Sequence, residues 1–218
     1  REAAVFTLEG VGVSAFLGFA LTGQIVGMAC ALAAVIVAVF LLLSHLGKPM
    51  VAWRAIVNVR RSWISRGTVA IGLFCVLGAL YIAGSTTPVL VPVEGIQTPL
   101  LYMVALVGLF ILLYPGLAMA ASAGVAFWTT PLLPILSLLQ GVASGFFVVL
   151  ATVDSEAMAS LTSQLPQIGF GLIAALAIFM IVYAVVMLRR GGAAALSSTY
   201  LVRKNPLAFW ALSVGLGL

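Results

Sequence analysis

The sequence predicts an all-α integral membrane protein, a polytopic helix bundle with about seven transmembrane helices in 218 residues. Hydrophobic residues make up 64% of the chain and charged residues 7%, against roughly 25% charged residues in soluble domains. So many apolar side chains cannot all be buried in one core, and much of the surface must face lipid. Alternation of apolar and polar residues with a period of two is absent, which argues against a membrane β-barrel.

The same composition excludes several other classes of protein. Intrinsic disorder and nucleic-acid binding need more charge, and a disulfide scaffold needs more than two cysteines. The excess of ten Lys and Arg over five Asp and Glu is typical of membrane proteins, which place it in cytoplasmic loops. We therefore expect membrane lipid, and no nucleic acid, among the partners.

The expected helices are apolar runs of about 20 residues, the length that crosses a hydrocarbon core about 30 Å thick. A seventh run begins near Asn205 and reaches Leu218, which is too short to span, so we expect the natural protein to continue. The first run carries Glu9 and lacks a small-residue cleavage site, unlike a signal peptide. We treat residues 1–218 as a single transmembrane domain. The six complete runs are Ala3–Thr22, Ile25–Leu46, Thr68–Ser85, Thr98–Ala120, Pro131–Val153 and Pro166–Leu188.

Basic residues occur only in alternate loops, which predicts the topology. The loop after the second run and the loop after the sixth run hold nearly all Lys and Arg, whereas the other loops hold Glu94, Asp154 and Glu156. By the positive-inside rule, we expect the N-terminus and both basic loops on the cytoplasmic side.

The first basic loop, residues 48–66, has an amphipathic pattern. At helical spacing, Arg54 and Arg61 fall on one side and Trp53 on another. Such a segment lies in the membrane interface with its tryptophans at headgroup level. Its arginines could also dock an acidic subunit or line the mouth of a pocket. Arg54 is the candidate for the pocket, and the candidates for partner docking are Lys48, Arg60, Arg61 and Arg66.

Three side chains in the cytoplasmic half could carry chemistry. Glu9 lies about 9 Å below the start of the first run, a depth at which ionisable groups commonly mark routes for ions, protons or substrates. Alternatively, Glu9 extends to the interface, or is protonated and hydrogen-bonded to a neighbouring helix. His45, the only histidine, ends the second run, where it either interacts with the helix dipole or exchanges protons. Tyr114 lies about two turns from the cytoplasmic end of the fourth run.

These three groups fit two functions. A carboxyl, an imidazole and a phenol at one depth are the partners that a quinone headgroup needs, because quinol oxidation releases two protons with two electrons. The same trio fits a proton-coupled transporter or channel that uses Glu9 and His45. One histidine and two cysteines cannot hold a bis-histidine haem or a four-cysteine iron–sulfur cluster within this chain. The small-residue pattern Gly141–Gly145 predicts close helix packing rather than ligand binding.

Several segments resemble known membrane subunits. Ser44–Pro49, Ala52–Ala55 and Arg61–Arg66 closely resemble the membrane anchor subunit of bacterial dimethyl sulfoxide reductase. Further along, Tyr114-Pro115-Gly116 and Phe127–Pro134 are similar to the broader polysulfide-reductase and NrfD-type membrane subunits.

This resemblance implies a haem-free, eight-helix quinone-binding subunit in a bacterial or archaeal inner membrane. Its partners would be a ferredoxin-like iron–sulfur subunit and a molybdopterin catalytic subunit, and substrate chemistry would occur on the latter. The bound cofactor would be menaquinone or ubiquinone. His45 is similar to a quinol-site histidine, Tyr114 to a tyrosine that hydrogen-bonds a quinone oxygen, and Glu9 to a polar pocket residue of the first helix. A purely structural anchor, with quinone bound by a partner, is a further alternative.

Overall fold

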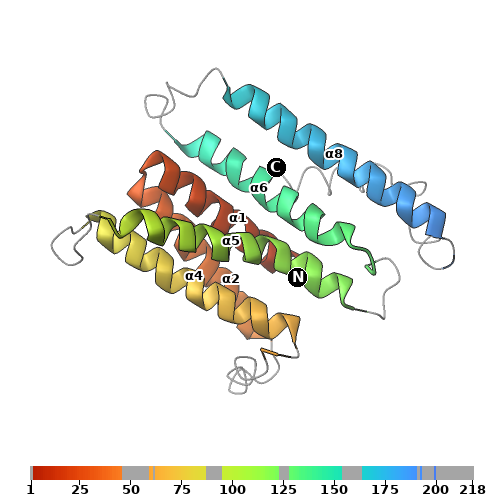
Figure 1. Ribbon diagram of the computed structural model, residues 1–218, viewed down its shortest axis with the longest axis horizontal. Coiled ribbons are helices and arrows are strands. Elements are labelled where there is room, and N and C mark those ends of the chain that lie inside the picture. The colour runs from red at the N-terminus through yellow and green to blue at the C-terminus, as the bar shows by residue number, and fades with distance from the viewer. Residues whose placement is uncertain are drawn as a thin grey trace.

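The computed structural model describes residues 2–45, 59–60, 62–86, 95–122, 128–153, 164–190, 192 and 199. Each of the six helices in these segments is long and apolar enough to cross a membrane, as predicted. The expected seventh run, Asn205–Leu218, lies outside the described residues. The helices are α1 (Glu2–Thr22), α2 (Ile25–His45), α4 (Trp63–Thr86), α5 (Gln97–Ala120), α6 (Leu132–Thr152) and α8 (Leu165–Arg190) (Figure 1).

Helix α1 lies at the centre of the arrangement. It packs against α2, α5 and α6, while α4 packs against both α2 and α5. Helices α1, α2, α4 and α5 therefore close a four-helix ring. Helix α6 covers the outside of this ring along α1 and α5, and α8 packs on α6 (Figure 1). Because the ring has an interior that no lipid reaches, it is the place where polar groups can be enclosed.

The helices alternate in direction, so that one end of the bundle collects the starts of α1, α4 and α6 and the ends of α2, α5 and α8. We call this the N-terminal end of the bundle; it lies on the right in Figure 1. Two contacts define it. The Phe6 ring packs edge-on against Tyr114, joining the start of α1 to the end of α5. The Arg190 guanidinium donates a hydrogen bond to the Thr129 carbonyl and so joins the end of α8 to the residues that precede α6.

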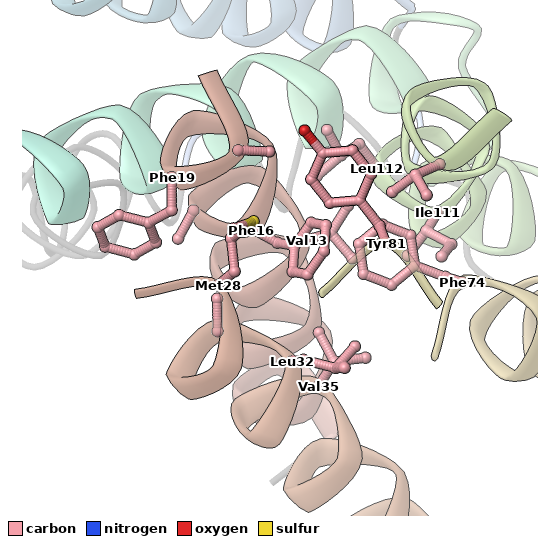
Figure 2. Packing of buried hydrophobic residues seen from close by; sticks show 14 of the residues in the cluster. Val13, Phe16, Phe19, Met28, Leu32, Val35, Phe74, Tyr81, Ile111 and Leu112 are labelled. Atoms are coloured by element: carbon pink, nitrogen blue, oxygen red, sulfur yellow. The ribbon is translucent and has the colours of Figure 1, made fainter. Parts of the chain in front are cut away.

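Aromatic side chains fill the middle of the ring. Phe16 of α1 packs edge-to-face on Phe74 and on Tyr81, both of α4, with ring centroids 5.4 and 6.5 Å apart (Figure 2). Such pairs add about 0.5–1.5 kcal/mol to the burial of the rings. Large apolar side chains such as Phe40 and Phe170 are exposed on the outside, as lipid-facing positions require.

The start of α4 corrects the sequence prediction. The expected start was Thr68, but the helix begins at Trp63, and Arg66 therefore lies in a helix rather than in a loop. The Ser62 hydroxyl accepts a hydrogen bond from the Ser65 N–H at 3.4 Å and so caps the first turn. The apolar run does not reveal this turn because Ser65 and the charged Arg66 interrupt it.

Helices α1 and α6 run parallel and approach closely through small residues. Gly10 lies opposite Gly141, and Ser14 lies opposite Gly145. The Ser14 hydroxyl donates a hydrogen bond to the Gly141 carbonyl at 2.6 Å. A Cβ on Gly145 would lie 2.5 Å from the Ser14 Cβ, closer than two carbon atoms can approach. The predicted packing role of Gly141–Gly145 is confirmed, and its partner on α1 is the stripe formed by Gly10, Ser14 and Gly18.

The Ser14 bond gives a first prediction. Replacing Ser14 by alanine removes the interhelical hydrogen bond and is expected to lower the free energy of unfolding by about 0.6 kcal/mol, the average for such bonds in membranes. The measurement is reversible unfolding of the full chain in detergent micelles. Thr152→Ala is the matched control, since the exposed Thr152 hydroxyl bonds only within its own helix. Equal losses for both variants would contradict the expected role of Ser14.

Candidate functional site

The Glu9 carboxyl is enclosed in the interior of the four-helix ring. The residue is 1% exposed, and neither carboxyl oxygen forms a hydrogen bond with any described atom. Glu9 lies two turns before Phe16 and therefore on the same face of α1, the face from which the Phe16 ring meets Phe74 of α4 inside the ring of helices. A buried polar group without a partner costs several kcal/mol in an apolar interior, so the fold retains this carboxyl at a considerable expense in stability.

The Tyr114 phenol lies beside this carboxyl. Tyr114 comes from α5, is 1% exposed and interacts electrostatically with Glu9. Its ring meets the Phe6 ring at 80° with centroids 5.8 Å apart. Since Phe6 is one turn before Glu9 on α1, the Tyr114 ring contacts α1 one turn before the carboxyl. The structure thus brings together two of the three side chains that the sequence singled out for chemistry.

Helix α4 contributes a glycine to the site that the sequence did not reveal. A Cβ on Gly67 would lie 2.6 Å from Cζ and 2.7 Å from Cδ2 of the Tyr114 ring. The phenol therefore packs directly on the backbone of α4. Gly67 lies seven residues before Phe74, and Glu9 lies seven residues before Phe16. Because these two rings pack together and α1 and α4 run in the same direction, Gly67 is level with Glu9. Nothing in the sequence around Gly67 distinguishes it from the other 21 glycines.

A small, buried residue of α2 is level with the site. Gly12 of α1 packs on Val35 of α2, and the two helices are antiparallel. Glu9 lies three residues before Gly12, and Ala38 lies three residues after Val35. Because the helices are antiparallel, Glu9 and Ala38 are at the same level, and Ala38 is 0% exposed. Ala38 of α2 and Gly67 of α4 are thus level with the carboxyl and carry no polar side chain, and Tyr114 of α5 supplies the phenol that interacts with it.

His45 lies at the same end of the bundle but not at the same level. It is the last residue of α2, seven residues beyond Ala38, which places its backbone about 10 Å from the level of Glu9 along the helix. Its side chain lies outside the described residues. The site that the structure describes is therefore the pair of Glu9 and Tyr114.

The basic residues of the first loop separate into two groups. Arg66 is held by its own chain: Nε and an Nη donate hydrogen bonds to the carbonyls of Val59 and Arg60, each at 3.0 Å, and the guanidinium lies 4.5 Å from the Trp63 ring centre. Arg60 is exposed at a turn. The others, Arg54, Lys48 and Arg61, lie outside the described residues, as does most of the amphipathic segment.

The chemistry available to the pair follows from its groups. A carboxyl takes up and releases protons, and a phenol donates a hydrogen bond to an oxygen acceptor. Within the described segments, no three His, Cys, Asp or Glu side chains come together as metal ligands would. The fold and the site define a class: a polytopic helical bundle of membrane-spanning type with a carboxyl and a phenol enclosed near one end. No family model matches this chain, and no curated protein is significantly similar to it.

Proposed function

We propose that this chain is the quinone-binding membrane subunit of a multi-subunit molybdopterin oxidoreductase. In this role it exchanges electrons between the membrane quinone pool and a ferredoxin-like iron–sulfur subunit, while substrate chemistry occurs on the molybdopterin subunit. The observation that carries the proposal is the Glu9 carboxyl, buried without a hydrogen-bond partner among the described residues and beside the Tyr114 phenol. The resemblance of Ser44–Arg66 and Tyr114–Gly116 to known quinone-linked membrane subunits supports it.

The two groups suit the two requirements of quinol chemistry. A quinol that loses two electrons also loses two protons, so its site needs a proton acceptor and a hydrogen-bond partner for a ring oxygen. Glu9 would accept a proton, and the Tyr114 hydroxyl would donate a hydrogen bond to the headgroup. A bound menaquinone or ubiquinone would supply the redox chemistry, and apolar helix faces would hold its tail. His45, at the same end of the bundle, would belong to the exit route for protons.

Binding of a short-tailed naphthoquinone to the full chain in lipid nanodiscs tests the proposal. We expect Tyr114→Phe to raise the dissociation constant about three- to tenfold, the range of one net hydrogen bond. Tyr102→Phe is the matched control on the same helix, because Tyr102 is 70% exposed on the outer face. An unchanged dissociation constant for Tyr114→Phe would place the headgroup away from Tyr114.

A second candidate rests on the same unpartnered carboxyl, since a proton-coupled transporter or channel also needs one in its path. Vesicles that contain this chain alone distinguish the two. Proton or solute flux without naphthoquinone binding would favour the transporter and would overturn the quinone proposal. Naphthoquinone binding without flux, together with copurification of an iron-containing partner, is the expected result.

A further inference from the structure

We propose that Gly67 is the positioning residue for the Tyr114 phenol, because the absence of a side chain at position 67 lets the ring lie against α4 at the level of Glu9. The distances from a Gly67 Cβ would be 2.6 Å to the ring carbon that carries the hydroxyl and 2.7 Å to Cδ2. Contacts this short do not occur between carbon atoms, so even a methyl group at position 67 must displace the ring.

The ring is held from two directions. Gly67 of α4 lies against the carbon that bears the hydroxyl, and Phe6 of α1 packs edge-on at a centroid distance of 5.8 Å. A tyrosine has only two side-chain torsions, so contacts on two sides of the ring determine where the hydroxyl points. Because Tyr114 is 1% exposed, other parts of the protein surround the remainder of the ring.

The first turn of α4 is the more rigid partner in this contact. Ser62 caps the turn, and Arg66, next to Gly67, donates hydrogen bonds to the carbonyls of Val59 and Arg60. Ser65 in the same turn is 3% exposed. A methyl group at position 67 therefore moves the ring rather than the helix, and the hydroxyl moves with the ring.

The functional consequence deepens the proposed quinone function and rests on it. If the Tyr114 hydroxyl donates to the headgroup, a displaced ring weakens headgroup binding while the proton acceptor Glu9 stays in place. For Gly67→Ala in the assembled complex, we expect the KM for quinol to rise about tenfold and kcat to change less than twofold. If Gly67 had only a structural role, Gly67→Ala would lower the amount of assembled complex, and the complex that did assemble would have the KM of the wild type.

The position of the ring can be tested without any activity. The full chain is labelled with 3-fluorotyrosine and studied by fluorine NMR in nanodiscs, and the resonance of Tyr114 among the five tyrosines is assigned by its loss in Tyr114→Phe. We expect Gly67→Ala to shift this resonance and to leave the others in place. Gly72→Ala is the matched control on the same helix, since no described atom lies within 4 Å of a Cβ at position 72. It should shift none.

A second variant keeps the test decisive if Gly67→Ala does not fold. Phe6→Leu removes the other contact of the ring and leaves Gly67 intact, and it should shift or broaden the same Tyr114 resonance. If Gly67→Ala folds and its Tyr114 resonance does not shift, the positioning role is overturned. If Gly67→Ala does not fold, an unchanged Tyr114 resonance in Phe6→Leu overturns it. If naphthoquinone binding fails while the expected shifts occur, the proposed function is wrong and the positioning role stands.

Discussion

Glu9→Gln is expected to lower quinol-coupled turnover of the assembled complex by at least about a hundredfold, the lower range for loss of a general acid or base. Glutamine has the shape of glutamic acid but cannot take up or release a proton. Because Glu9 is 1% exposed and its oxygens have no described partner, the substitution breaks no described hydrogen bond. The measurement is the steady-state rate with a quinol donor, normalised to the iron-containing partner that copurifies.

Glu9→Asp is the matched variant for this prediction. Aspartate keeps the carboxyl but shortens the side chain by one methylene, so we expect partial turnover between those of the wild type and Glu9→Gln. Full turnover in an assembled Glu9→Gln complex would show that Glu9 is not the proton acceptor. Loss of assembly in both variants would instead show that Glu9 is needed for the bundle to fold, contrary to the prediction.

Gly116→Ala is expected to destabilise the bundle by about 3 kcal/mol, the upper end of the usual range for overpacking. A Cβ on Gly116 of α5 would lie 2.5 Å from both the carbonyl carbon and the oxygen of Leu133, at the start of α6. These are backbone atoms, so no side-chain rotation can relieve the clash. The helices must separate, which also weakens the 2.9 Å hydrogen bond from the Ser137 hydroxyl to the Leu112 carbonyl.

The midpoint of thermal unfolding, followed by far-ultraviolet circular dichroism in detergent, measures this effect. Gly171→Ala in α8 is the matched control, because no described atom lies within 4 Å of a Cβ at that position. Alanine favours a helix by up to about 1 kcal/mol over glycine, so the control should be as stable as the wild type or slightly more stable. Similar midpoints for the two variants would contradict the close approach of α5 and α6.

The sequence predicts the six described helices well because the thickness of a bilayer sets their length. Every predicted end lies within two residues of the observed one except the start of α4. There, a turn that contains Ser65 and Arg66 extends the helix toward the first basic loop. Ser62 caps this turn, and Arg66 donates a hydrogen bond to the Val59 carbonyl. Hydropathy cannot identify such a turn, because its stability comes from hydrogen bonds rather than from apolar length.

The site could be predicted only in part, for a related reason. Glu9 and Tyr114 are unusual residues for a membrane span, so the sequence alone singles them out, and their shared depth follows from counting residues. The relation between Tyr114 and Gly67 depends on how two helices pack, which no local pattern encodes. The separation of His45 from Glu9 likewise becomes visible only through the contact between Gly12 and Val35.

The central position of α1 has a consequence for biogenesis. Ribosomes complete α1 before α5, which supplies Tyr114, and before α6, which supplies Gly141 and Gly145; both follow about a hundred residues later. Until those helices enter the bilayer, Glu9 and Ser14 of α1 are not covered by α5 and α6. A carboxyl in lipid costs on the order of 3 kcal/mol. We therefore expect α1 on its own to be less stable in lipid than α1 packed on α5. A nascent chain that stops before Tyr114 carries in α1 an acid that α5 does not cover, which gives membrane quality control a physical mark of an unfinished protein.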